Sequence, residues 1–567
     1  MTHRNNTITA HAMCSVLKLF ACLGLAAVQG AELSSPLVIS SGLEMASNWA
    51  ITLTVEQHRH ANDQVAFNTR SYCYRSQCSY PGPTISLIPG DNFTLTLENK
   101  LGPYLHGDDH IMNTMHSPNT TNLHTHGLHI SPLVDDVFVE AGPGESLHYP
   151  YEVPPDHAPG THWYHAHYHG SSTYQIMGGL VGALIVEPLP SQNIPASITD
   201  ADQYIMVLTH LKFDQEVSTR TGEINQGCGR DFYCDPVVEA PLCTGEETEA
   251  SPYESFRIYS YLELGVDSGN DMEINEQFVD PSIQDMILVN GQFIPTVKLV
   301  VGSAAVFRMV SATGGGMLVL HLQEPLACSI SIIAYDGVYM KTALRKETIA
   351  LVEGSRADVQ IMCHRAGMFS LYNRNKTEVL VVEVHPFGET KPKVTDEELA
   401  AIVQPSYLDD LMEDVEIDSY YSVHTWRNGL NHSICGHWLG AGYNCSALEP
   451  TGPEIPNATS VECPFSQFSG SRGLNPANYT AAHKLVTPVN AINEWTIYGM
   501  GNDQHPIHVH VHHMQVISFV GDDSANALGH EEFYLPGQWR DTLPAFQGVL
   551  TVRFKAADFE GETVVHW

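Results

Sequence analysis

Basic residues are scarce in this chain. Lys and Arg together number 27 among 567 residues, whereas Asp and Glu number 64, so the formal net charge is −37. Such a charge repels the phosphate backbone of nucleic acids, and nucleic-acid binding is therefore a poor hypothesis. Charged residues of both signs make up only 16% of the chain and hydrophobic residues 43%, a balance typical of globular proteins. The length predicts several domains.

Long apolar runs are absent after the first thirty residues, and no later segment reaches the roughly 18 apolar residues that a membrane-spanning helix needs. Within 1–30, Lys18 precedes an apolar stretch at 19–28, and small residues follow at Gly30 and Ala31. This is the order of a secretory signal peptide, with Met13 as an alternative start and a buried N-terminal helix as the alternative structure. We therefore expect a secreted or extracellular protein without a transmembrane segment.

The chain contains no Cys-x-x-Cys pair, so it lacks the usual pattern of zinc ribbons and thioredoxin-like redox centres. Two of the twelve Cys, Cys14 and Cys22, lie in the predicted signal segment, and the other ten are expected to form disulfides in a secreted chain. Their spacing does not fix the pairing. Acceptor sequences for N-glycosylation, which agree with an extracellular route, occur at Asn92, Asn119, Asn375, Asn431, Asn444, Asn457 and Asn478.

Most of the chain has the periodicity of strands. Short β-branched or alternating stretches recur, for example at 93–97, 296–300, 306–310 and 549–554, and they predict an all-β fold. Domain boundaries are predicted near residues 190 and 390.

Two connecting regions interrupt the strand pattern. An acidic stretch at 388–419 contains a short predicted helix at 395–401 and is interpreted as an interdomain linker. Its acidic run from Asp409 to Asp418 favours a solvated face over a cation site. The Cys-, Gly- and Pro-rich stretch at 431–478 is predicted to be a loop insertion pinned by disulfides.

Histidine, by contrast, is abundant, with 31 residues against 27 Lys and Arg. Thirteen of them fall within four short segments, at 124–129, 162–169, 505–513 and 566, so their distribution is not random. The segments contain three pairs separated by one residue: His124 with His126, His165 with His167, and His508 with His510.

These pairs indicate a metal site. In a strand, residues i and i+2 project from the same face about 6.6 Å apart, so each pair presents two imidazoles side by side. Imidazole nitrogen lies about 2 Å from a bound transition metal, and two-metal sites hold their ions about 3.5–4 Å apart, so one pair can serve two metals. Without Cys or carboxylate among them, the pairs favour Cu, Zn, Fe or Ni over Ca or Mg. Histidines without a metal are the alternative interpretation.

The motifs resemble those of the multicopper oxidases, the superfamily of laccases, ascorbate oxidases and ferroxidases, and the form is nearest to the bacterial-type laccase-like branch. The resemblance runs from about Trp49 to the last residue, with supporting stretches at 80–84, 178–185, 289–292, 353–359 and 539–542. It implies copper as cofactor, in a trinuclear cluster between the first and third domains and a mononuclear type 1 site in the third. The implied cupredoxin-like β-sandwich domains span 31–190, 198–387 and 426–567, the third of them incomplete, with a linker at 388–425.

The resemblance also implies roles for individual residues. His124 and His508 match the ligands of type 2 copper, and His505 matches a type 1 ligand. The matches to the type 3 copper pair are His126, His165, His167, His510 and His566. Asp135 lies where this branch has an acid that helps deliver protons to reduced oxygen, with its neighbour Asp136, or a purely structural role, as alternatives. Positions beside the ligands or at the surface are expected for His129, His162, His169, His512 and His513.

One part of the family pattern is missing. The fourth motif of the family is His-Cys-His followed by a further His and usually a Met, whereas here His566 is followed by Trp567. Type 1 copper needs a thiolate with two His. We therefore expect an incomplete type 1 site, a type 3 pair short of one His, and copper binding without laccase turnover. An incomplete product of a longer gene is the favoured interpretation, and a degenerate homologue is the alternative.

The leading hypothesis is an oxidase that takes single electrons from phenols, amines or metal ions and reduces O2 to water. Its partners are then a small-molecule reductant and O2. A secreted, non-catalytic glycoprotein that uses the scaffold for copper binding or adhesion is the second hypothesis, and a coding sequence that continues past Trp567 into Cys-His would separate the two. A zinc-dependent hydrolase is weaker, because the His pairs include no carboxylate that could act as a base.

Overall fold

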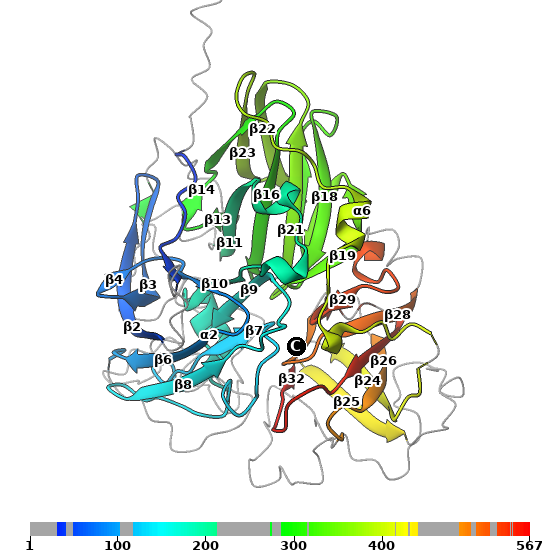
Figure 1. Ribbon diagram of the computed structural model, residues 1–567. Coiled ribbons are helices and arrows are strands. Elements are labelled where there is room, and N and C mark those ends of the chain that lie inside the picture. Colours follow the sequence, from blue (N-terminus) through cyan, green and yellow to red (C-terminus); the bar gives the residue numbers. More distant parts are fainter. Residues whose placement is uncertain are drawn as a thin grey trace, which may run out of the picture.

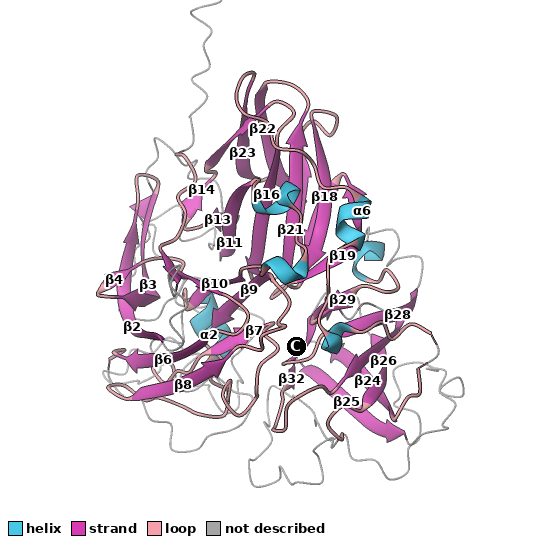
Figure 2. Cartoon of the chain, viewed as in Figure 1, coloured by secondary structure: helices cyan, strands magenta, loops and turns pink. Residues whose placement is uncertain are grey.

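The computed structural model describes residues 31–40, 49–102, 117–169, 171–212, 273–274, 285–314, 317–413, 415–428, 431–439, 487–499, 506–521, 530–544, 546 and 548–566. The predicted signal segment, most of the predicted loop insertion, His505 and Trp567 lie outside these residues. Strands predominate in the described part (Figure 2). They form six sheets that pack in pairs into three units (Figure 1), and the predicted all-β fold is confirmed.

The first unit packs two mixed sheets face to face. Strict alternation along its strands decides which side chains enter the core: Phe93, Leu95 and Leu97 are buried, while the residues between them are partly exposed. In spatial order one sheet contains β1 (Val38–Ser40), β5 (Thr84–Leu87), β10 (Val181–Val186), β9 (Gly160–His165) and β7 (His124–His126). The other contains β12 (Glu273–Ile274), β3 (Val65–Tyr74), β2 (Trp49–Ala61), β6 (Asn92–Asn99) and β8 (Ser146–Glu152), with β4 (Gln77–Cys78) paired to β3.

The second unit has the largest sheet. Its strand β16 is buried along its whole length because the first unit covers the outer face, where Trp163 and Val181 pack on Val207 and Val310. The large sheet contains β14 (Gln292–Phe293), β13 (Asp285–Val289), β11 (Asp202–Lys212), β16 (Ala304–Ala312), β21 (Arg356–Cys363), β18 (Cys328–Tyr335) and β19 (Val338–Lys346). The facing sheet contains β15 (Thr296–Val300), β23 (Glu378–His385), β22 (Gly367–Asn373), β17 (Leu318–Leu322) and β20 (Thr348–Leu351).

The third unit begins earlier in the chain than predicted. Its strand β24 starts at Ser419, inside the predicted linker 388–425, and pairs with β26 from its first residue. The acidic residues before it suggested a linker, but Tyr421 and Val423 alternate into the core. One sheet contains β25 (Asn431–Leu439), β24 (Ser419–Asn428), β26 (Ile492–Gly499), β31 (Gly548–Lys555), β28 (Met514–Gly521) and β29 (Trp539–Arg540). The other contains β30 (Thr542–Pro544), β27 (Pro506–Val509) and β32 (Val565–His566).

Helices in the described part are short. The helix predicted at 395–401 is present as α6 (Asp396–Ala400), where the Thr395 hydroxyl accepts from the backbone N–H of Glu398 and the Glu398 carboxylate accepts from that of Thr395. None of the described helices is long and apolar enough to span a bilayer. The remaining helices are α2 (Ser172–Met177), α3 (Ala196–Thr199) and the 3₁₀ turns Pro190–Gln192, Ser406–Leu408 and His530–Phe533. The described members of the acidic run, as expected for a solvated face, are exposed: Asp409, Asp410, Glu413, Glu416 and Asp418.

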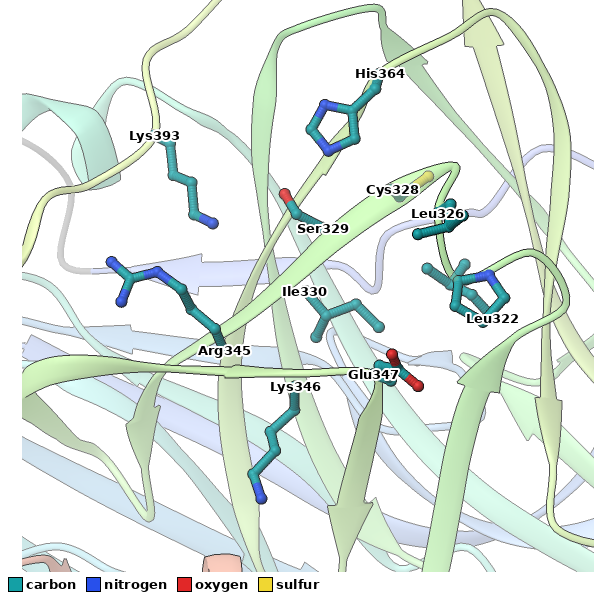
Figure 3. A pocket seen from close by; sticks show the side chains of 11 residues that line it. Leu322, Leu326, Cys328, Ser329, Ile330, Arg345, Lys346, Glu347, His364 and Lys393 are labelled. Atoms are coloured by element: carbon teal, nitrogen blue, oxygen red, sulfur yellow. The ribbon is translucent and has the colours of Figure 1, made fainter.

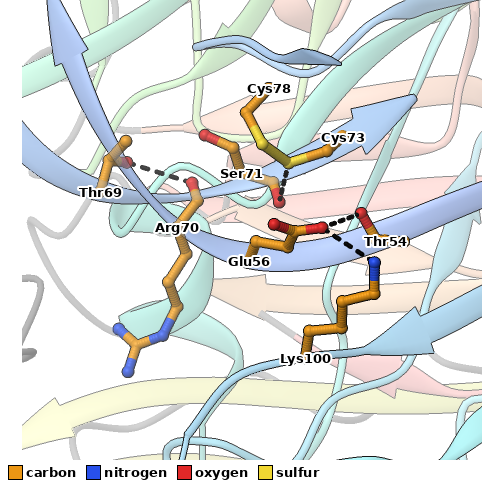
Figure 4. Close-up of a disulfide and its surroundings, with 8 residues drawn as sticks. All are labelled: Thr54, Glu56, Thr69, Arg70, Ser71, Cys73, Cys78 and Lys100. Carbon is orange, nitrogen blue, oxygen red and sulfur yellow. Dashed lines mark hydrogen bonds and ion pairs between the residues drawn. A yellow bond between two sulfur atoms is a disulfide. The ribbon is translucent and has the colours of Figure 1, made fainter. Parts of the chain in front are cut away.

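Two disulfides lie in the described part, and they pair four of the ten Cys that were expected to form disulfides. Cys73–Cys78 joins β3 to β4 (Figure 4), and Cys328–Cys363 joins the neighbouring strands β18 and β21 of the second unit. Glu56 lies near the first bridge, but both sulfurs are engaged in the disulfide and cannot bind a metal as thiolates.

The described glycosylation acceptors differ in accessibility. Asn92 and Asn375 are exposed, whereas Asn119 is buried and its side-chain oxygen accepts from Arg70. Asn119 is therefore a poor acceptor in the folded protein.

The two disulfides should differ in their contribution to stability. Their Cys residues are 35 and 5 positions apart, so the loop-entropy relation gives about 4 kcal/mol for Cys328–Cys363 and about 2 kcal/mol for Cys73–Cys78. We expect the variant with both Cys328 and Cys363 replaced by Ala to lose about twice as much unfolding free energy as the variant with both Cys73 and Cys78 replaced by Ala. Urea unfolding followed by circular dichroism measures both, and equal losses would contradict the prediction.

Candidate metal centre

The histidine pairs of the first and third units meet at one junction. Antiparallel pairing of β7 with β9 sets His124 opposite His165, and pairing of β27 with β32 sets His508 opposite His566. The rings of the two units face each other, with His124 stacked on His510 at 3.8 Å between ring centroids. The structure thereby brings together seven of the eight predicted ligands: His124, His126, His165, His167, His508, His510 and His566. The eighth, His505, lies outside the described residues.

The ring nitrogens gather at distances that suit shared metal ions. Nδ1 of His126 lies 3.4 Å from Nε2 of His165. Nε2 of His566 lies 3.0 Å from Nε2 of His167 and 3.2 Å from Nε2 of His510. Two nitrogens bound tetrahedrally to one ion at about 2 Å are themselves about 3.3 Å apart. The two groups can therefore each hold one ion.

His124 and His508 provide a third position. In each, Nε2 is buried and has no hydrogen-bond partner among the described residues. Their other nitrogens are engaged, since Nδ1 of His124 lies 2.6 Å from the Asp135 carboxylate and Nδ1 of His508 lies 2.9 Å from the backbone oxygen of Asp541. A buried polar atom without a partner is costly. A metal ion bound by both Nε2 atoms would remove that cost, so the residues present fit such a group.

The protonation state of the rings also suits metal binding. Burial, reinforced by neighbouring histidines, lowers the pKa of His126, His165, His167 and His510 well below the usual range, and burial lowers that of His508 to about 3. The rings are therefore neutral at pH 7, as metal ligands must be. A donor set made only of imidazole favours copper or zinc over calcium or magnesium.

Asp135 and Asp136, which the sequence left as alternatives, have different surroundings. Asp135 is buried, and besides His124 it accepts hydrogen bonds from the backbone N–H and the hydroxyl of Thr125. Asp136 is partly exposed and accepts from the backbone N–H of Phe138. Of these two carboxylates, only that of Asp135 contacts one of the seven histidines.

Sequence reasoning missed a buried ion pair beside the cluster. Arg356 of β21 donates to both carboxylate oxygens of Asp541, which precedes β30. The same carboxylate lies 3.4 Å from Nε2 of His126. Burial alone would raise the pKa of Asp541, but the Arg356 guanidinium holds it well below the usual range. Both residues belong to stretches that supported the family resemblance, 353–359 and 539–542, and that was the available signal.

Four of the five histidines not expected to be ligands are buried beside the cluster or the ion pair, and only His169 is exposed. Nε2 of His513 lies 3.5 Å from the Asp541 carboxylate, and Nε2 of His129 lies 2.9 Å from that of Asp558. The side chains of His162 and His512 are buried in the same region. A surface position is therefore wrong for His129, His162, His512 and His513.

A cavity of about 550 Å³ lies in the second unit. Figure 3 shows Arg345 and Lys393 on one side and Leu326 on the other. Arg345 is already paired with Asp396 at 3.1 Å. None of the seven histidines lines this cavity, so it is not part of the metal centre.

Val511 follows the ligand His510 in an unusual backbone conformation. Its φ is +69°, in the left-handed region that β-branched residues rarely enter. The backbone N–H of His512 donates to the oxygen of His510 at 2.7 Å, which closes a tight turn around Val511. The turn redirects the chain immediately after the cluster.

Comparison with solved structures defines the class of fold. The multicopper oxidase McoA of Aquifex aeolicus aligns with a TM-score of 0.59 over 95% of this chain and 96% of its own, at 15% identity. A multicopper oxidase from Campylobacter jejuni, described as a metallo-oxidase, aligns with a TM-score of 0.56 over 95% and 92%, at 16% identity. The three units therefore form an all-β cupredoxin architecture.

The sequence matches define the family. Multicopper oxidase domain profiles match residues 107–191 and 447–566, which contain the histidine motifs of the first and third units. Multicopper oxidase LPR1 of Arabidopsis thaliana is 21% identical over 476 residues, 81% of this chain and 68% of its own length. The chain belongs to the multicopper oxidase superfamily and is laccase-like.

The strained turn at Val511 generates a test of stability. Val509 and Val511 flank His510 and are both buried, at 2% and 6% exposure, so replacing either by Gly removes similar packing. A left-handed conformation costs a residue other than Gly about 1–2 kcal/mol, which Gly avoids. We therefore expect V511G to lose about 1–2 kcal/mol less unfolding free energy than V509G in the metal-free protein. Denaturant unfolding measures both, and an equal or larger loss in V511G would show that the turn is not strained.

Proposed function

We propose that this protein is a secreted laccase-like oxidase that takes single electrons from phenols, amines or metal ions and reduces O2 to water. One observation supports it most directly: seven imidazoles from two units, five of them buried and two partly buried, gather in groups whose ring nitrogens lie within 4.8 Å of one another. Of the four groups that these histidines form among the described residues, three contain imidazole nitrogens alone and the fourth adds the Asp541 carboxylate to His126 and His508. A ligand set dominated by imidazole suits copper better than a hard cation. The metallo-oxidase activity in the description of the C. jejuni structure is one form of the proposed reaction.

Copper ions bound at this centre would supply the electron storage that links one-electron oxidation to four-electron reduction of O2. The chain itself would orient the imidazole ligands and bury most of them. His126, His165 and His167 belong to the first unit and His508, His510 and His566 to the third, so the two ligand sets meet at the junction of these units. Burial lowers the pKa of His126, His165, His167, His508 and His510 and so keeps these five rings neutral.

Asp135 has two proposed tasks. Its Oδ2 accepts from Nδ1–H of His124, which leaves Nε2 of that ring free to bind metal. Its position as the only buried carboxylate in contact with His124 among the described residues also suits the proposed delivery of protons to reduced oxygen.

The orienting task of Asp135 can be separated from the proton task. We expect D135A to weaken copper binding roughly 10- to 100-fold because His124 loses the acceptor that fixes its tautomer. D135N keeps a side-chain oxygen for His124 and should retain most of the affinity. The neighbouring D136A is the matched control, since Asp136 contacts none of the seven histidines. Copper titration against a competing chelator measures all three, and equal effects of D135A and D136A would contradict the assignment.

Turnover depends on a site for electron entry. The family uses a Cys-ligated type 1 copper there, and Trp567 stands at the position of that Cys. We predict that the chain 1–567 binds copper without blue colour or oxygen uptake. Replacing Trp567 by Cys and adding His, with a further His and Met downstream, should restore both.

Absorption spectra and oxygen uptake of the two copper-loaded forms provide the test. Blue colour and turnover in the 567-residue form would contradict the ligand assignment. An inactive extended form that still binds copper would instead favour a non-catalytic copper-binding glycoprotein.

A further inference from the structure

The dipeptide Asp541–Thr542 lies between two histidines from different units. His126 of the first unit and His508 of the third stack with 3.6 Å between ring centroids. Nε2 of His126 lies 3.0 Å from the Thr542 hydroxyl oxygen, and Nδ1 of His508 lies 2.9 Å from the backbone oxygen of Asp541. One short segment therefore contacts both rings on the sides that face away from the cluster.

The direction of each hydrogen bond follows from the available protons. The Thr542 hydroxyl has one proton, and it donates this proton to Oδ1 of Asp541 at 2.7 Å. Its oxygen can then only accept from His126, so the proton of that ring lies on Nε2. Nδ1 of His126, which faces His165, is left without a proton.

His508 is fixed in the opposite sense. The backbone oxygen of Asp541 can only accept, so the proton of His508 lies on Nδ1. Its Nε2 is the buried nitrogen that has no partner among the described residues. Two stacked rings are thus held in opposite tautomers by adjacent residues.

We propose that Asp541 and Thr542 are positioning residues that commit Nδ1 of His126 and Nε2 of His508 to bind copper. The proposal rests on the copper-binding function proposed above. Neighbours of this kind set which nitrogen of a histidine binds a metal and orient its ring. The dipeptide does so for ligands of two units at once.

The second unit, which contributes none of the seven histidines, holds this dipeptide in place. Arg356 donates through Nη1 and Nη2 to the two oxygens of the Asp541 carboxylate, and its Nη1 and Nε also donate to the backbone oxygens of Gly354 and Thr161, respectively. The backbone at Gly127 lies close to this ion pair. Its φ is +94°, and a Cβ at this position would collide with the side chains of Arg356 and Asp541. The residue after His126 must therefore be Gly for the ion pair to reach the ring.

The chain contains a matched control for this arrangement. Thr161 is likewise a buried strand residue whose hydroxyl donates to the carboxylate of a buried ion pair, Asp358 with Arg308. The hydrogen bonds of the Arg308 guanidinium and the Asp358 carboxylate do not include any of the seven histidines. T161V therefore removes the same chemistry from the same kind of site, and it keeps the backbone oxygen of Thr161 that accepts from Arg356.

The experiment compares T542V, T542S and T161V with the unchanged full chain. Copper-free protein is titrated with Cu²⁺ against a competing chelator, and its unfolding midpoint is recorded separately. We expect T542V to bind Cu²⁺ roughly 10- to 100-fold more weakly, the range found when such neighbours are lost. T542S, which keeps the hydroxyl, should bind almost as well as the unchanged chain. T161V should lower the unfolding midpoint but leave Cu²⁺ affinity unchanged.

Nitrogen-15 NMR of the histidine rings in the copper-free protein reports the tautomers directly. A H126Q variant identifies the signals of His126, which should be those of the Nε2–H form in the unchanged chain and in T542S. In T542V the share of the Nδ1–H form should rise, because the Asp541 carboxylate at 3.4 Å is then the remaining acceptor for Nε2–H. Unchanged Cu²⁺ affinity and tautomer in T542V, or an equal loss of affinity in T161V, would overturn the proposal. Failure of the unchanged chain to bind Cu²⁺ would instead refute the proposed function, while the tautomers would still test the role of Thr542.

Discussion

The ion pair between Arg356 and Asp541 is the contact on which the geometry of the metal centre depends. Both side chains are fully or almost fully buried, and each oxygen of the carboxylate accepts from the guanidinium. Removing one partner of such a pair leaves an uncompensated buried charge, at a cost of about 3–5 kcal/mol. The pair joins the second unit to the third, and through His126 it also reaches the first. The three units therefore meet at an ion pair that also contacts a histidine of the cluster.

Alternation along strands explains why two imidazoles project from one face, but not which nitrogen of each ring faces the cluster. An H-x-H pair places two imidazoles on one face, yet each ring must still expose the correct nitrogen. His124, His508 and His126 each have one nitrogen occupied by a neighbour, respectively Asp135, Asp541 and Thr542. The neighbours come from loops and strand ends, where the backbone can approach a ring from behind. For these three rings, residues outside the histidine motifs therefore decide which nitrogen faces the cluster.

The sequence was sufficient to predict the strands and the histidines that meet, because both depend on short-range patterns. Strands such as β6 and β31 follow from alternation alone. Asp541 and Arg356 could not be assigned roles, because their contacts join residues 185 positions apart and depend on how the units dock. The start of β24 was missed because the acidic residues that precede it resemble a linker, although Tyr421 and Val423 are buried in the core. The turn at Val511 was unpredictable, since a β-branched residue normally excludes it.

Contacts other than those among the histidines also join the units. Arg356 and Asp541 satisfy each other, and the apolar group of Trp163, Val181, Val207 and Val310 joins the first and second units. These contacts contribute to the positions of imidazoles that come from two ends of the chain, so bound ions do not have to supply all of the free energy that brings the units together. Metal binding would in addition remove the local cost of the Nε2 atoms of His124 and His508, which lack partners among the described residues.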